Sequence, residues 1–338
     1  MEKTVTILTE SELRQIVPLD PAVIEVIEKA FVSLFRQEVT MPPVLSMAMP
    51  ENNAEIDIKT AYIKGFEGIA IKVSPGFFNN PMIGLNSLNG LMTVLDARTG
   101  LAKAVLLDNG YLTNIRTGAA GGIAAKYLAP TNTTTATIFG AGTQAMMQLR
   151  AAHSVTNLDT AFICARDRSK AAKLAVQLSR ELKINVTASG NPATSVAQSQ
   201  LVITTTPAEH PIFKAEWIHP GLHITAMGSD QAGKHELETD ALMQSDLYVV
   251  DSKSQCELLG ELQWVDPAQM SSDLNIKDLG NIICSPHEGR TDDNQITICD
   301  LTGTGAQDTA IASYALSVAE DNRLGTVINT AGDKLDQA

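Results

Sequence analysis

The sequence is poor in the residues and runs that mark several large classes of protein. It contains only four cysteines, far apart and without a CxxC pair, which argues against a disulfide framework or a zinc site and suits a reducing cytoplasm. No apolar run approaches the roughly 18 residues that a membrane span needs, and the first residues contain no apolar signal core. We therefore expect a cytoplasmic protein without a metal site and without a membrane partner.

Positive charge is also scarce, since 25 lysines and arginines stand against 38 aspartates and glutamates, for a formal net charge of −13. No basic stripe offsets this charge, so we expect no nucleic-acid partner. The length of 338 residues suits two domains, and a hydrophobic content of 44% is ordinary for a globular chain.

Residues 134–148 contain the pattern around which the chain is organised. A short apolar run at 136–139 breaks at Gly140 and Gly142, and a helical pattern begins at Thr143 and Gln144. Strand, glycine turn and helix in this order are the dinucleotide-binding fingerprint, in which the backbone and the helix N-terminus approach a pyrophosphate. We predict a coenzyme site at these four residues; the alternative is an ordinary strand-to-helix turn without a ligand.

Strands and helices alternate after the fingerprint, which predicts an α/β fold with a Rossmann-type, doubly wound parallel sheet over residues 116–309. Before it, short apolar runs separated by glycine and proline turns predict a mostly antiparallel sheet. A helix with one apolar face at 310–321 is expected to pack back on that sheet, so residues 1–115 and 310–338 form a second, α+β domain. The last ten residues are expected to fray.

The second strand of the parallel sheet ends in a turn that bears on the coenzyme. An acid at its end suits the ribose 2′-hydroxyl of NAD, whereas arginine suits the 2′-phosphate of NADP. Here Ala165 occupies the acid's position and is followed by Arg166, Asp167 and Arg168. We therefore favour NADP(H) over NAD(H), although Asp167 can also reach a ribose and the turn can simply be solvated.

Several further motifs identify a family. Residues 112–117 (LTNIRT), 226–230 (AMGSD), 259–261 (LGE) and 300–308 (DLTGTGAQD), together with the fingerprint, resemble the ornithine cyclodeaminase/μ-crystallin family over essentially the whole chain. Within it, residues 59–62 and 72–78 are most similar to the cyclodeaminase homologues of ectoine utilisation. The resemblance implies a homodimer, a substrate held between the two domains over the nicotinamide, and hydride transfer involving the α-carbon of a small amino acid or its imine.

The resemblance also implies roles for single residues. Asp230 matches the family's acid/base, although it can instead cap a helix that begins near residue 231. Lys72 and Arg116 match the residues that bind the substrate carboxylate, and we place Lys72 with Asp230 in the catalytic set. Lys234 matches a position near the coenzyme, whereas His235 is expected to be structural.

The remaining predicted coenzyme positions end other strands of the parallel sheet. Thr204, Thr205 and Thr206 end one strand, and Met227 and Gly228 end the next. The threonines can equally be ordinary β-branched strand residues. By resemblance, the turn at Gly303 closes over the edge of the nicotinamide.

Two departures from the family pattern concern the substrate. Ser46 stands where the family has a third, arginine ligand for the carboxylate, and Lys59 stands, thirteen residues before Lys72, where ornithine-processing members have a glutamate. A lysine repels a distal ammonium and attracts a second carboxylate, which favours a dicarboxylic substrate such as an aspartate-type imine. If Glu55 or Asp57 takes that position instead, a diamino acid is favoured.

Three functions therefore remain open. The first is an NAD(P)-dependent imine reductase or amino-acid dehydrogenase for a small dicarboxylic substrate. The second is a cyclodeaminase of a diamino acid that recycles its coenzyme and releases ammonia. The third is a non-catalytic NADP(H)-dependent binding protein, which would not need Asp230.

Overall fold

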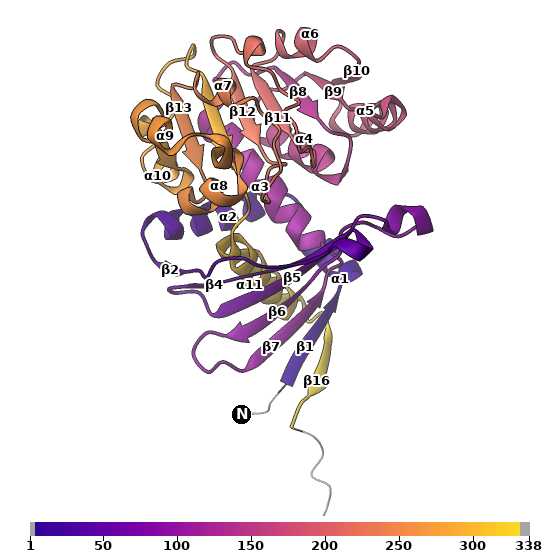
Figure 1. Cartoon of the computed structure of the whole chain (residues 1–338). Coiled ribbons are helices and arrows are strands. Elements are labelled where there is room, and N and C mark those ends of the chain that lie inside the picture. Colours follow the sequence, from indigo (N-terminus) through magenta and orange to yellow (C-terminus); the bar gives the residue numbers. More distant parts are fainter. Residues whose placement is uncertain (1–3, 332–338) are drawn as a thin grey trace, which may run out of the picture. The chain divides into compact units, whose positions relative to one another are not determined.

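The computed structural model describes residues 4–331 and divides the chain into two compact units (Figure 1). Unit 1 consists of the residues up to Pro18, Glu25–Arg116 and the residues from Thr304 onward, whereas unit 2 consists of Leu19–Ile24 and Thr117–Gly303. Most of the expected C-terminal fraying lies outside the described residues.

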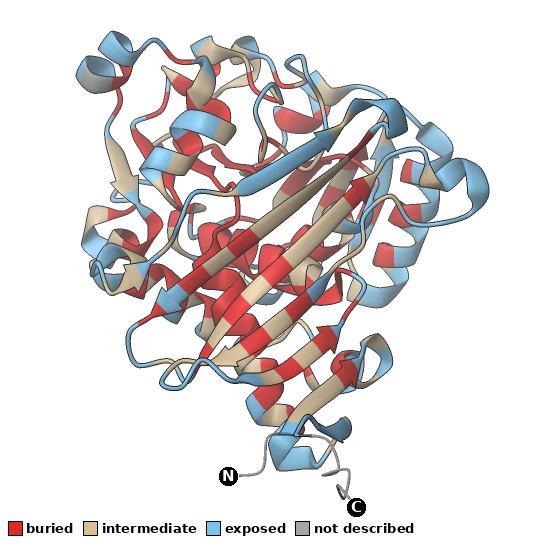
Figure 2. Cartoon of the chain, turned by 60° about the horizontal axis from the view of Figure 1, so that its bottom comes forward, coloured by how far each residue is buried: buried red, intermediate tan, exposed pale blue. Residues whose placement is uncertain are grey.

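Unit 1 is built on an eight-stranded sheet in the order β16-β1-β7-β6-β5-β4-β2, with β3 paired to β4. Its strands pair antiparallel except for β1 and β7, which are parallel. The strands are β1 (Thr4–Thr9), β2 (Val39–Thr40), β3 (Leu45–Met49), β4 (Ala54–Ile63), β5 (Gly68–Phe77), β6 (Leu91–Asp96), β7 (Ala102–Leu107) and β16 (Thr326–Asn329). Buried positions alternate with more exposed ones along much of β4 to β7 (Figure 2), as a sheet with one covered face requires.

Helix α11 (Gly305–Asn322) covers part of this sheet, on β4 and β5. A side chain at Gly305 would overlap the backbone of Thr60, so glycine permits the close approach. Thr309 then donates its hydroxyl to the carbonyl of Ala61 at 2.7 Å and accepts the N–H of Ala70 at 3.1 Å. The other helices are α1 (Glu10–Ile16) and two that pass from one unit into the other, α2 (Pro21–Phe35) and α3 (Tyr111–Leu128); short 3-10 turns are η1 (Pro50–Asn52) and η2 (Asn80–Ile83).

Unit 2 is built on an eight-stranded, wholly parallel sheet in the order β10-β9-β8-β11-β12-β15-β13-β14. Its strands are β8 (Thr135–Phe139), β9 (Thr160–Cys164), β10 (Asn185–Ser189), β11 (Leu201–Thr204), β12 (His223–Ala226), β13 (Leu247–Val250), β14 (Ile276–Asp278) and β15 (Thr297–Asp300). The chain leaves β8 toward β9 and later returns to β8's other side with β11. This reversal is the topological switch point at which doubly wound sheets bind ligands, beyond the carboxyl ends of the strands.

The helices of unit 2 connect these strands. They are α4 (Thr143–Val155), α5 (Arg168–Leu182), α6 (Pro192–Val196), α7 (Thr239–Leu242), α8 (Lys253–Leu259), α9 (Pro267–Asp273) and α10 (Leu279–Cys284), with 3-10 turns η3 (Ala215–Trp217), η4 (Glu261–Trp264) and η5 (Pro286–Glu288). The predicted α/β fold with a doubly wound parallel sheet and a second α+β unit is confirmed. None of the helices in the described residues is long and apolar enough to cross a membrane.

The largest departure from the expected segments is at the final helix. It begins at Gly305 rather than residue 310, so residues 304–309 group with unit 1 instead of with the parallel sheet. The small residues of this turn conceal a helix start that Thr304 and Gln307 fix with a capping box, in which the N–H of Thr304 donates to the Gln307 carboxamide at 2.7 Å.

Candidate functional site

A cavity of about 1090 Å³ opens at the switch point of the unit 2 sheet. It lies beyond the carboxyl ends of β8, β9, β10 and β11. Its lining comprises Phe139, Gly140, Ala141, Gly142, Cys164, Ala165, Arg166, Asp167, Arg168, Lys170, Ser189, Gly190, Pro192, Thr205, Thr206, Pro207, Ala208, Glu209, His210 and Ile212. Its position and volume suit a ligand of dinucleotide size.

The two fingerprint glycines differ in backbone conformation and in the space around them. Gly140 has φ +120°, and a Cβ there would overlap the hydroxyl of Thr205, so the fold itself requires glycine. Gly142 has ordinary φ, and a Cβ there would meet nothing within 4 Å. No side chain caps the N-terminus of α4, which begins at Thr143. The free space at Gly142 and these helix N–H groups form a cradle that fits a pyrophosphate.

Charged residues line the cavity at the turn that follows β9. Arg166, Arg168 and Lys170 line it together with a single acid of this turn, Asp167. The carboxylate of Asp167 accepts the backbone N–H of Lys170 at 3.0 Å and so caps α5, which lowers the pKa of Asp167. The acid is thus already engaged by the helix, while the cationic side chains are available to a phosphate.

The cavity contains about half of the predicted coenzyme residues. Gly140, Gly142, Ala165, Arg166, Asp167, Arg168, Thr205 and Thr206 line it. The other predicted positions, Thr143, Gln144, Thr204, Met227, Gly228, Lys234 and Gly303, are not among the lining residues described. Sequence reasoning missed the segment at 207–212, whose only signal is its position directly after a strand that ends at the switch point.

Asp230 follows β12 on a turn rather than on a helix. Residues 231–236 form no helix, and the next one, α7, starts at Thr239, so the helix-capping alternative for Asp230 is wrong. Lys234 pairs with it, Nζ to Oδ1, at 2.5 Å, and the Asp230 side chain is 45% exposed. The structure therefore presents a solvent-accessible carboxylate with a cation beside it.

A second group of ionisable side chains is buried in unit 1. Lys72 on β5 contacts Asp308 on α11, Nζ to Oδ2, at 3.0 Å, and Arg116 on α3 contacts the other carboxylate oxygen, Nε to Oδ1, at 3.1 Å. Lys59 on β4 stands directly opposite Lys72 in the β4–β5 pairing. All four side chains are buried. We call Lys59, Lys72, Arg116 and Asp308 the cationic cluster.

Burial dominates the electrostatics of the cationic cluster. Burial lowers the pKa of Lys72 to about 7; Asp308 opposes this shift, whereas Arg116 and Lys59 add to it. Burial alone would raise the pKa of Asp308, but Lys72, Arg116 and Lys59 outweigh it and hold that pKa below its ordinary value. Three cationic side chains therefore act on the single carboxylate of Asp308, and an anionic ligand at this cluster would meet several positive charges.

Asp308 is the residue of this cluster that sequence reasoning missed. It ends the motif at 300–308 and lies in the first turn of α11. Lys72, predicted to bind substrate, is not an edge-strand residue, because β5 lies between β4 and β6.

The structure also locates the two departures that bear on the substrate. Lys59 lies within β4 rather than in a loop, and Asp57 lies two residues before it on the same face of the strand. Ser46 on β3 is directly opposite Asp57. This face of β4 therefore carries both a cation, Lys59, and a carboxylate, Asp57.

The fold and the cavity define an α/β protein of the dinucleotide-binding type, whose unit 1 also contains a buried cationic cluster. The model of the ornithine cyclodeaminase/mu-crystallin family matches residues 3–322, and the chain belongs to this family. It is 48% identical to the "uncharacterized cyclodeaminase y4tK" of Sinorhizobium fredii over 97% of this chain and 99% of that protein. It is 35% identical to an alanine dehydrogenase of Archaeoglobus fulgidus, over 95% and 97% of the two chains.

Solved structures share the whole fold. A Thermococcus litoralis Δ¹-pyrroline-2-carboxylate reductase in complex with NADH and L-proline has a TM-score of 0.88 and 28% identity, covering 95% of this chain and 99% of its own. The iminosuccinate reductase of Paracoccus denitrificans in complex with NAD⁺ has a TM-score of 0.88 and 25% identity, covering 96% and 99%. The predicted family and the prediction of an enzyme are confirmed.

Proposed function

We propose that this protein is an NAD(P)-dependent imine reductase or amino-acid dehydrogenase that acts on a small dicarboxylic substrate of the aspartate or iminosuccinate type. The observation that carries the proposal is Lys59, a buried cation opposite Lys72 that acts electrostatically on both Lys72 and Asp308. A monocarboxylic substrate would engage Lys72 and Arg116 only, whereas a second carboxylate can also engage Lys59. The similarity to an iminosuccinate reductase supports this choice.

Each residue then has a distinct part in the reaction. Arg116 and Lys72 bind the α-carboxylate, with Asp308 fixing both cations, and Lys59 binds the second carboxylate. Asp230 gives a proton to the imine nitrogen in reduction and takes one from the amine in oxidation. Lys234 stabilises the ionised form of Asp230 between these steps. The bound nicotinamide coenzyme supplies or accepts the hydride.

The proposed coenzyme is NADP(H) in preference to NAD(H). Arg166 and Arg168 line the cavity where the ribose is expected, and Asp167 is engaged as the cap of α5. A guanidinium binds a 2′-phosphate with charge-assisted hydrogen bonds. The related structures contain NADH and NAD⁺, so this preference separates the chain from those relatives. We assign coenzyme binding to the remaining predicted positions as well: Thr143, Gln144, Thr204, Met227, Gly228, Lys234 and Gly303.

A cyclodeaminase is the second candidate, and Asp57 is the observation that favours it. Its carboxylate shares a strand face with Lys59 and can accept the distal ammonium of a diamino acid. The name of the relative with 48% identity agrees with this alternative. A non-catalytic binding protein does not account for the cationic cluster.

We also propose a homodimer that works in the cytoplasm and, on the resemblance at 59–62 and 72–78, in ectoine utilisation. The sheet face of unit 1 opposite Lys59 carries exposed apolar side chains, among them Leu45, Met47, Tyr62 and Leu107. Exposed apolar patches of this kind mark association surfaces. Sedimentation of a Met47→Lys, Tyr62→Lys double variant should show monomers if this face pairs two copies, and unchanged dimers would place the interface elsewhere.

The function is tested by following absorbance at 340 nm with NADPH and NADH in parallel. Oxaloacetate with ammonium provides the dicarboxylic imine, pyruvate with ammonium is the monocarboxylic control, and ornithine with oxidised coenzyme is assayed separately for ammonia. Faster oxidation with the dicarboxylic mixture and with NADPH supports the proposal. Ammonia and proline from ornithine without net coenzyme change would establish the cyclodeaminase instead.

A further inference from the structure

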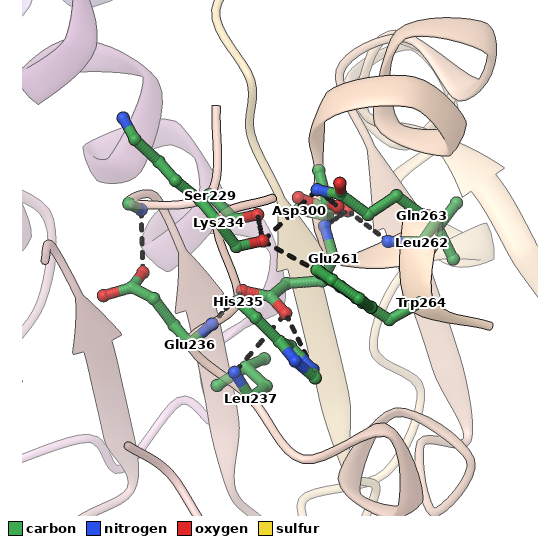
Figure 3. Close-up of polar contacts among 12 residues, drawn as sticks. Ser229, Lys234, His235, Glu236, Leu237, Glu261, Leu262, Gln263, Trp264 and Asp300 are labelled. Atoms are coloured by element: carbon green, nitrogen blue, oxygen red, sulfur yellow. Dashed lines mark hydrogen bonds and ion pairs between the residues drawn. The ribbon is translucent and has the colours of Figure 1, made fainter. Parts of the chain in front are cut away.

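Three buried acids of unit 2 are connected in series (Figure 3). The backbone N–H of Glu236 donates to Glu261 Oε1 at 2.9 Å, and the backbone N–H of Glu261 donates to Asp300 Oδ2 at 2.9 Å. Tyr248 donates its hydroxyl to the same oxygen of Asp300 at 3.0 Å. Glu236, Glu261 and Asp300 are each fully buried. Burying a carboxylate costs free energy, because the charge loses its hydration. Three buried acids in one chain of hydrogen bonds therefore indicate a role in which the carboxylate oxygens accept specific hydrogen bonds.

Glu236 differs from the other two because its carboxylate joins two separate turns. Its Oε1 accepts the backbone N–H of Thr206 at 2.6 Å and the Thr206 hydroxyl at 2.7 Å. Its Oε2 accepts the backbone N–H of Gly228 at 2.8 Å. Thr206 lines the coenzyme cavity, and Gly228 lies two residues before Asp230. One side chain therefore fixes the coenzyme wall and the turn that carries the proposed acid/base.

The turns at Thr206 and Gly228 pack too closely to admit a side chain at position 228. A Cβ at Gly228 would overlap both the carbonyl oxygen of Thr206 and the carboxylate of Glu236. The loop beyond Asp230 is held as well: the Trp264 indole donates to the Lys234 carbonyl at 2.9 Å and the Gln263 carboxamide accepts the Gly233 N–H at 2.9 Å. The loop after Asp230 is thus fixed by Gln263 and Trp264, and the turn before Asp230 is fixed by Glu236. The Glu236 carboxylate therefore sets the distance between this turn and the cavity wall at Thr206.

We propose that Glu236 is a positioning residue that holds Asp230 in register with the bound coenzyme. The proposal rests on the proposed function, in which Asp230 moves the proton. Both oxygens must accept hydrogen bonds, which only a carboxylate can do. In Glu236→Gln the side chain keeps its size, but its –NH₂ faces a backbone N–H and one of the two connections is lost.

The test compares the full-length protein with Glu236→Gln and with a matched control. Arg290→Lys alters a half-buried charged residue that also holds several loops, through the carbonyls of Leu128, Gln295 and Leu222. These contacts lie at the amino ends of β12 and β15, away from the carboxyl ends where the cavity opens. Measurements are the thermal midpoint, the NADPH dissociation constant by fluorescence, kcat and KM, the isotope effect with 4-deuterated NADPH, and amide hydrogen exchange of the peptide covering Gly228 to Asp230.

For Glu236→Gln we expect exchange of that peptide to be faster and kcat to fall about 100-fold, the loss expected from a displacement near 1 Å. The NADPH dissociation constant should stay within about threefold and the isotope effect should rise, because the cavity remains and hydride transfer becomes slower. Arg290→Lys should change the thermal midpoint without this kinetic pattern. If Glu236→Gln does not fold, Glu236→Asp keeps both acceptor oxygens on a shorter side chain and should show the same pattern more weakly.

Unchanged exchange of the Gly228 to Asp230 peptide would overturn the positioning role whether or not the wild-type enzyme reduces an imine. Faster exchange with wild-type kcat would also overturn it. If the wild-type enzyme is inactive toward every imine and amino acid tested, the proposed function fails, and exchange alone then decides whether Glu236 holds the turn.

Discussion

Replacing Lys59 by Met removes one positive charge from the cationic cluster while retaining most of the side-chain volume. Lys59 is buried, opposite Lys72, and acts electrostatically on both Lys72 and Asp308. A hydrogen bond to a charged group contributes about 2 kcal/mol, which corresponds to a factor of about 30 in kcat/KM. We therefore expect Lys59→Met to lower kcat/KM for the dicarboxylic imine about 30-fold, while the value for the pyruvate imine changes less than about threefold.

The matched control is Lys64→Met, five residues along the chain at an exposed position, which should change neither value. A second result follows from the electrostatics, because Lys59 lowers the pKa of Lys72. Its removal should move the alkaline limb of the pH–rate profile, to which Lys72 contributes, to higher pH. Equal losses for both imines, or no loss for either, would refute the assignment of Lys59 to the second carboxylate.

Three further predictions test other parts of the molecule. Gly142→Val should weaken coenzyme binding at least about tenfold in a fluorescence titration, with little change in thermal midpoint, because a Cβ at this position meets only open space. Gly140→Val should instead lower the thermal midpoint, because Gly140 has a φ of +120° and a Cβ there would overlap Thr205. Arg166→Gln should lower the ratio of kcat/KM for NADPH to that for NADH about tenfold, and a constant ratio would contradict the proposed 2′-phosphate site. The pKa of Lys72 is lowered by burial to about 7, so the unfolded chain binds more protons from about pH 7 to pH 10 and the contribution of Lys72 to the free energy of unfolding rises with pH across that window. Lys72→Met should flatten this rise in urea denaturation, and an unaltered slope would show that Lys72 is not the group responsible.

Local sequence was sufficient for the parts of the fold that depend on local rules. The fingerprint predicted a strand, a glycine turn and a helix, and the structure has β8, the turn at Gly140 and α4. Asp20 before Pro21 is typical of a helix start, and the carboxylate of Asp20 accepts the N–H of Val23 at 3.0 Å at the start of α2. Strand and helix alternation predicted the parallel sheet.

The sequence also decided the candidate residues of the cationic cluster, because lysine within an apolar strand and arginine in a family motif are visible without coordinates. Only the tertiary structure decided that Lys59 and Lys72 face each other across two strands and share Asp308 from a helix more than 200 residues away. Glu236 shows the same limit. In the sequence it is one acid beside Lys234 and His235, and its role depends on two turns that come together only when β11 and β12 pair. Cross-strand register and the burial of charge are properties of the packed chain, and no local spacing encodes them.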